Sequence, residues 1–307
     1  MTKQMKANLF ALSAILFWST VATAFKLSLK ELSYSQLLLI SSGTSLLFLS
    51  ILFIFKIKAR GLNSPSNRAE SLFSEFRVKN IIRSVALGFL NPFLYYLILF
   101  KAYSLLPAQE AISLNYTWGI IVVLFSVVLL KQKINLSSIF FLAISFAGVV
   151  IIATAGNLAD LQFKNSEGVA YALGSAVIWG LFWVLNVKDK RDEIVKLFLN
   201  FFFGFFFVVI YIIFFSSFKI NASSSIIAAI YVGIFEMGIS FVFWLKALQL
   251  SKTTAIISNL AYLSPFLSLF LVSIVLKEQI ELSTLIGLCL IVIGIILQNI
   301  KKNIKKI

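Results

Sequence analysis

Glu236 is a lone carboxylate in the middle of a long apolar segment. Residues 223–244 read SSSIIAAIYVGIFEMGISFVFW, and Glu236 is the only charged residue among them. If this segment crosses a membrane, a charged side chain at its centre costs about 3 kcal/mol on insertion scales. Such a residue needs either a hydrogen-bonding partner on a neighbouring helix or a ligand. We expect Glu236 to bind an ammonium group or a proton, with interhelical hydrogen bonding as the alternative.

Helical spacing places Ser240 on the same face as Glu236, because residues four apart lie one above the other. An internal repeat, described below, aligns this pair with Asn91 and Tyr95 in the first half of the chain. Polar atoms that face lipid have no hydrogen-bond partner, so both pairs should face the protein interior. We therefore expect Asn91, Tyr95 and Ser240 to contribute to a binding site near Glu236.

A second group of candidates combines aromatic rings and amides near the centres of other apolar segments. Tryptophan is enriched at membrane surfaces, so a central tryptophan indicates either the wall of a cavity or packing between helices. Rings of this kind can also hold an ammonium group by a cation–π contact. The amides and tyrosines could bind the same ligand or a neighbouring helix. The candidates in this group are Trp18, Asn115, Tyr116, Trp118, Trp179, Trp183, Asn186, Asn259 and Tyr262.

Two further residues have types that could bind a ligand but positions that favour another role. Trp244 lies near a predicted helix end, where we expect it to anchor the helix at the membrane surface. Glu110 follows Pro107 at a predicted helix start, where the helix dipole favours a carboxylate. We expect Glu110 to be solvated.

The elements that must position these residues are ten apolar segments. The chain has 307 residues, of which 60% are apolar and 13% charged, against about 25% charged in an average soluble domain. Segments of about 20 apolar residues are long enough to cross a membrane. We predict an all-α integral membrane protein with ten transmembrane helices, at about residues 8–29, 35–56, 80–100, 108–130, 135–154, 168–187, 194–215, 223–246, 253–276 and 281–300.

Composition also excludes several classes of function. There is no histidine and only one cysteine, Cys289, so a His-ligated metal and a Ser–His catalytic pair are excluded. A P-loop sequence for ATP is absent as well. The net charge of +15 comes from Lys and Arg at predicted helix ends, not from a nucleic-acid-binding patch. We expect no catalytic residue, no metal, no cofactor and no nucleic-acid partner.

The distribution of Lys and Arg predicts the orientation of the chain. With the N-terminus placed inside, 21 of the 27 Lys and Arg residues lie on the inner side. Positively charged residues near helix ends mark the cytoplasmic side of a membrane protein. We expect a multi-pass protein of the cell membrane with both termini in the cytoplasm.

The two halves of the sequence resemble each other. LLKQKINLSS at 129–138 aligns with VLKEQIELST at 275–284, and Lys101–Ala102 aligns with Lys246–Ala247. Each half has five predicted spans, and an odd number means that the second copy enters the membrane from the opposite side. We therefore predict two inverted five-helix repeats, 1–156 and 157–307, around a central cavity. Inverted repeats of this kind place a substrate site near the middle of the membrane.

These features resemble the drug/metabolite transporter superfamily, EamA type. The resemblance rests on Trp18–Ser19, Trp179–Gly180, the sequence AIISNLAYLSP at 255–265 and LKEQIEL at 276–282. LNYTW at 114–118 is similar to a segment of bacterial aromatic amino-acid exporters, although Gly119 stands where a proline commonly follows. The resemblance implies ten helices around a central cavity and the export of small metabolites.

We expect a secondary transporter of the inner membrane that exports amino acids or related amphipathic compounds by alternating access. One alternative is a proton-coupled exporter of cationic drugs that uses Glu236 as the coupling residue. A different class of alternative is a membrane channel or a structural membrane protein. The expected partners are the lipid bilayer, a small-molecule substrate and protons, and the choice between monomer and homodimer stays open.

Overall fold

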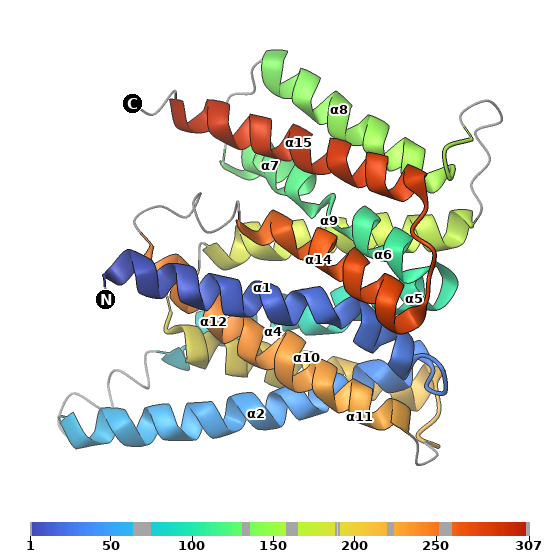
Figure 1. Ribbon diagram of the computed structural model, residues 1–307. Coiled ribbons are helices and arrows are strands. Elements are labelled where there is room, and N and C mark those ends of the chain that lie inside the picture. Colours follow the sequence, from blue (N-terminus) through green and yellow to red (C-terminus); the bar gives the residue numbers. More distant parts are fainter. Residues whose placement is uncertain are drawn as a thin grey trace.

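The computed structural model describes residues 2–63, 75–130, 136–157, 165–187, 189, 191–219, 224–251 and 260–304. The described residues form helices packed side by side (Figure 1). Helical segments lie within all ten predicted ranges. Those of the first half are α1 (Lys3–Ser28), α2 (Tyr34–Asn63), α4 (Val78–Gly88), η1 (Phe89–Leu94), α5 (Tyr95–Leu105), α6 (Ala108–Asn115), α7 (Trp118–Leu130) and α8 (Leu136–Ala153). Those of the second half are α9 (Ser166–Val187), α10 (Glu193–Phe215), α11 (Ser224–Tyr231), η2 (Val232–Ile239), α12 (Ser240–Leu250), η3 (Ala261–Leu263), α14 (Ser264–Leu271), η4 (Val272–Leu276) and α15 (Leu282–Ile304).

Six helices of the described part are long and apolar enough to cross a membrane. They are Lys3–Ser28, Tyr34–Lys58, Val78–Leu105, Ser166–Asn186, Glu193–Phe215 and Ser224–Leu250. Shorter apolar helices cover Phe140–Ala153, Ala261–Leu276 and Leu282–Leu297. The all-helical membrane architecture is therefore confirmed for the described residues, and the count of ten spans stays a prediction.

The helices that carry Asn91 and Glu236 are both interrupted near their middle by a π-helical segment. Asn91 lies in η1 with an extended backbone (φ −150°, ψ 120°), and Pro92 follows it. Glu236 lies in η2, where Ser240 donates its hydroxyl to the carbonyl of Phe235 five residues earlier. Insertions of this kind break the α-helical hydrogen-bond ladder and often mark functional sites. The two interruptions fall at the positions that the sequence repeat aligns.

Helices α8 and α15 pack along each other through glycines (Figure 1). A Cβ atom added at Gly148 of α8 would meet the carbonyl oxygen of Gly287 on α15, and one added at Gly287 would meet Ile152. Small residues let helix backbones approach closely, and this contact replaces the hydrophobic effect as the attraction between helices in lipid.

Gly148→Ala is expected to destabilise the protein, because the added methyl group must push one backbone away from another. Overpacking of this kind costs about 1–3 kcal/mol. Gly174→Ala is the matched control, since a Cβ there would meet only Ile98, at an ordinary contact distance of 3.9 Å. Thermal unfolding of the two purified variants in detergent measures the difference. Equal melting temperatures would show that the α8–α15 approach is not tight.

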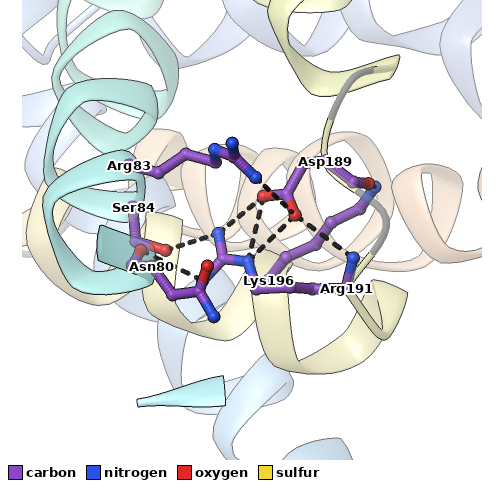
Figure 2. Close-up of polar contacts among 6 residues, drawn as sticks. All are labelled: Asn80, Arg83, Ser84, Asp189, Arg191 and Lys196. Atoms are coloured by element: carbon purple, nitrogen blue, oxygen red, sulfur yellow. Dashed lines mark hydrogen bonds and ion pairs between the residues drawn. The ribbon is translucent and has the colours of Figure 1, made fainter. Parts of the chain in front are cut away.

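An ionic cluster joins α4 to the turn between α9 and α10 (Figure 2). Asp189, 3% exposed, accepts hydrogen bonds from Arg191 Nε at 3.0 Å and from Arg191 Nη2 at 2.6 Å. Arg83 Nη1 lies 3.6 Å from the same carboxylate, and Lys196 Nζ donates to the Asp189 carbonyl at 3.1 Å. Burial opposes ionisation, but the hydrogen bonds from Arg191 outweigh it and hold the pKa of Asp189 below its usual value.

Arg191 also binds directly to α4. Its Nη2 donates to Ser84 Oγ at 2.9 Å, and its Nη1 donates to the Asn80 carbonyl at 3.2 Å (Figure 2). One guanidinium thus satisfies a carboxylate and two acceptors on another helix, a geometry that lysine could not reproduce. The cluster fixes the predicted cytoplasmic end of α4 against the start of α10.

Candidate functional site

The two carboxylate oxygens of Glu236 differ in their hydrogen bonding within the described residues. The side chain is 6% exposed, and its Oε1 accepts a hydrogen bond from Tyr96 Oη at 2.9 Å. Its Oε2 is buried and has no hydrogen-bond partner among the described residues. A buried acceptor without a partner is costly, so this oxygen is suited to receive a proton or a ligand donor.

Aromatic rings from three helices extend from Glu236 as one connected group, here called the aromatic cluster. It consists of Tyr95, Tyr96, Trp179, Trp183 and Phe241. The rings of Tyr95 and Tyr96 lie 4.7 Å apart, and Tyr95 stacks on Trp179 at 4.4 Å with 24° between the planes. The Trp179 ring lies 5.6 Å from both Trp183 and Phe241. The cluster therefore connects the ring that binds Glu236 to the two tryptophans of α9.

Asn115 extends the site toward α9. Tyr95 Oη donates to Asn115 Oδ1 at 3.4 Å, and Asn115 Nδ2 donates to Ser175 Oγ at 2.9 Å. Asn115 is the last residue of α6, just before the break that separates α6 from α7. The break persists although Gly119 replaces the proline that the resemblance implies at this place. The break leaves the Asn115 amide buried at the end of α6.

Trp118 and Tyr262 form an aromatic pair that is separate from the aromatic cluster. Their rings stack at 6.4 Å with 22° between the planes. The carbonyl oxygen of Trp118 lies 3.4 Å from the place that a Cβ of Gly180 would occupy, next in the chain to Trp179. The structure therefore brings Trp118 to α9, the helix that carries Trp179 and Trp183.

The remaining candidates lie outside the cluster. Trp18 packs on Trp244 at 5.0 Å. The Ser240 hydroxyl is used within its own helix, so it does not bind a ligand in this conformation. Asn91 is fully buried, and neither amide atom has a hydrogen-bond partner among the described residues. Tyr116 and Asn186 are buried, and Asn259 lies outside the described residues.

Two expectations were wrong. Trp244 is 5% exposed rather than anchored at the surface, because α12 packs on α1 and turns the ring toward Trp18. Glu110 is 3% exposed rather than solvated. The turn before α15 covers the start of α6, where the Glu278 carboxylate accepts from the backbone N–H of Ala108.

Sequence reasoning missed Tyr96, Phe241 and Ser175. The offset that pairs Asn91 with Glu236 also pairs Tyr96 with Phe241, so the repeat contained the signal. Ser175 lies one helical turn before Trp179 and therefore on the same face of α9. The α-helical spacing of four residues places Tyr95, and not Tyr96, on the same face as Asn91, so it does not predict Tyr96.

The long apolar helices define a multi-pass membrane protein by class. The model of the EamA-like transporter family matches residues 5–154 and again residues 166–300. The chain belongs to the EamA-like transporter family.

Two bacterial transporters are similar in sequence. An uncharacterized transporter of Clostridium kluyveri is 29% identical over 210 residues, which cover 64% of this chain and 65% of that protein. The uncharacterized transporter YvbV of Bacillus subtilis is 28% identical over 223 residues, 71% of each chain. One crystal structure aligns over 94% of both chains with a TM-score of 0.62 at 23% identity, a likeness that shows the fold alone.

Proposed function

We propose that this membrane transporter is a secondary exporter of small metabolites, namely amino acids or related amphipathic compounds, that works by alternating access. The observation that carries the proposal is the Oε2 of Glu236, which lies beside the aromatic cluster and has no partner in the described part of the chain. A cation and an adjacent apolar group are the two features that such a site recognises.

Charge neutralisation at Glu236 supplies a coupling mechanism. A carboxylate buried without a counter-charge is unfavourable, so either an ammonium group of the substrate or a proton must occupy Oε2 when the site is closed to water. The substrate side chain would lie against Trp179 and Tyr95, and Asn115 would bind a further polar group. Exchange of substrate for a proton then follows from their competition for one oxygen.

The proposed transport cycle uses the two halves, 1–156 and 157–307, as inverted repeats. The matching π-helical interruptions at Asn91 and Glu236 support this division. The start of α1 and the end of α15 lie on the same side of the molecule, in keeping with two cytoplasmic termini (Figure 1). Rocking of the halves would expose the central site to each side in turn.

A proton-coupled exporter of cationic drugs is the second candidate, because the same carboxylate and rings would bind an apolar cation. Uptake of labelled phenylalanine, methionine and a cationic dye into proteoliposomes, with and without a pH gradient, separates the two. Saturable amino-acid uptake supports the metabolite exporter. Uptake of the dye alone, driven only by the gradient, would replace it with the drug exporter.

Trp118→Ala is expected to weaken substrate binding about fivefold with little change in melting temperature. Loss of one aromatic contact is worth about 1 kcal/mol, and this ring is only partly buried. Trp118→Phe, which keeps a ring opposite Tyr262, is the control. Equal transport by the two variants, or unfolding of the alanine variant alone, would instead assign Trp118 to packing.

A further inference from the structure

A polar pocket lies apart from the aromatic cluster, at the end of the molecule where α1 turns into α2. Its volume is about 390 Å³, and Lys26, Lys30, Ser33, Tyr34 and Glu278 are among the residues that line it. None of the residues around it belongs to the aromatic cluster. Small-molecule sites in proteins have volumes of about 300–1,000 Å³, so one metabolite fits.

Two lysines give this pocket positive charge. Lys26 Nζ donates to the carbonyls of Tyr103 at 3.0 Å and Leu106 at 2.8 Å, and these bonds hold it in place with one N–H to spare. Lys30 is exposed and has no hydrogen bond or ion pair within the described part of the chain. Both ammonium groups therefore have capacity for an anion.

The start of α2 also lines the pocket, through Ser33 and Tyr34. Ser33 Oγ accepts from the Gln36 backbone N–H at 3.2 Å, and Gln36 Oε1 accepts from the Ser33 N–H at 2.9 Å. This reciprocal pair is a capping box, which fixes the N-terminus of the helix. The positive end of the α2 dipole is thereby held at the pocket, where it favours a carboxylate.

Glu278 gives the same pocket a negative charge, and the position of this carboxylate is fixed. Glu278 Oε1 accepts from the Ala108 N–H at 3.1 Å, and Oε2 accepts from the Gln109 N–H at 3.4 Å. Gln109 in turn donates to the Gln279 carbonyl at 2.8 Å and accepts from the Glu281 N–H at 2.9 Å. Each Glu278 oxygen keeps a further lone pair for a donor. The carboxylate can thus bind an ammonium group without giving up its place at α6.

We infer that this pocket binds a zwitterionic amino acid at the outer mouth of the transporter. Lys26, Lys30 and the start of α2 bind its carboxylate, and Glu278 binds its ammonium group. The inference rests on the proposed function and adds a site at which the substrate leaves or enters the central path. A site for a simple anion would not need Glu278, and a site for a simple cation would not need the lysines.

Equilibrium binding of three matched compounds tests this assignment. L-Phenylalanine has both charges, 3-phenylpropionate only the carboxylate and phenethylamine only the ammonium group. Binding is measured on the purified full-length chain in lipid nanodiscs, in a Glu236→Gln background that removes the central carboxylate. In this background Lys30→Gln should weaken phenylalanine and 3-phenylpropionate about threefold, as expected for an exposed charge pair, and leave phenethylamine unchanged.

Glu278→Gln should give the opposite pattern, with weaker phenylalanine and phenethylamine and unchanged 3-phenylpropionate. Glutamine keeps an acceptor oxygen for the Ala108 N–H but loses the one that the Gln109 N–H uses, so the melting temperature of this variant is measured beside its affinities. Lys219→Gln is the matched control, an exposed lysine outside the pocket. Equal affinities of the Lys30 and Lys219 variants for all three compounds would overturn the assignment. Binding is measured here without transport. A failure of amino-acid uptake would therefore count against the proposed function and would leave the binding result for this pocket unchanged.

Discussion

Replacing Glu236 with glutamine abolishes uptake driven by a pH gradient and leaves the fold intact. Glutamine has nearly the same shape, and its amide oxygen can still accept the hydrogen bond from Tyr96. It cannot take up and release a proton, and it carries no charge for a substrate ammonium group. Gradient-driven uptake should therefore fall to the level of protein-free liposomes, while the melting temperature stays near that of the wild type.

Glu167→Gln is the control for this variant. Glu167 is an exposed carboxylate that pairs with Lys101 at 3.8 Å, so its loss removes the same charge away from the site. Its uptake should match that of the wild type. Undiminished pH-driven uptake by the Glu236→Gln protein would reject the coupling role and leave the hydrogen bond to Tyr96 as a contact between helices.

The second large effect is expected for Asp189→Asn, which should lower the stability of the folded protein. The substitution leaves the guanidinium of Arg191 and the ammonium of Lys196 without their buried counter-charge. Removing one partner of a buried ion pair costs about 3–5 kcal/mol. We expect a large fall in melting temperature in detergent and a loss of folded protein in the membrane.

The pH dependence of stability provides a further measurement on the same residue. The pKa of Asp189 in the folded protein is below its ordinary value of 3.8, so its ionised form stabilises the fold. This contribution to stability is present at a pH above the ordinary pKa and disappears as the pH falls through the lowered pKa. The Asn variant should lack that part of the acid sensitivity.

Lys101→Gln is the control for Asp189→Asn. It breaks an exposed pair and should cost less than about 1 kcal/mol. A similar cost for both variants would contradict the structural role of the cluster.

The sequence predicted the parts of the site that depend on burial alone. A charge within an apolar helix must face the interior, and Glu236 does. Central tryptophans and amides must likewise find partners, and Trp179 and Asn115 lie together with Tyr95. These placements follow from the free-energy cost of exposing polar groups to lipid and from the packing of large rings. They do not depend on how each helix is rotated about its own axis.

Helix rotation was the part that could not be predicted. The choice of Tyr96 over Tyr95 as the partner of Glu236 depends on how η1 and η2 turn the helices that follow them. A π-helical insertion adds one residue to a turn, so every residue after it moves to a different face of the helix. A prediction based on α-helical spacing does not include this change. The positions of Glu110 and Trp244 were missed for a related reason, since each depends on a neighbouring segment that covers a helix end.

A counterflow experiment provides the decisive test of the carrier mechanism. Proteoliposomes are loaded with unlabelled substrate, taken as whichever of phenylalanine, methionine or the cationic dye the protein takes up, and labelled substrate is added outside. A carrier with an alternating site predicts a transient accumulation of label that requires internal substrate and saturates with external concentration. Flux that is linear in concentration and indifferent to internal substrate would contradict the carrier and indicate a channel.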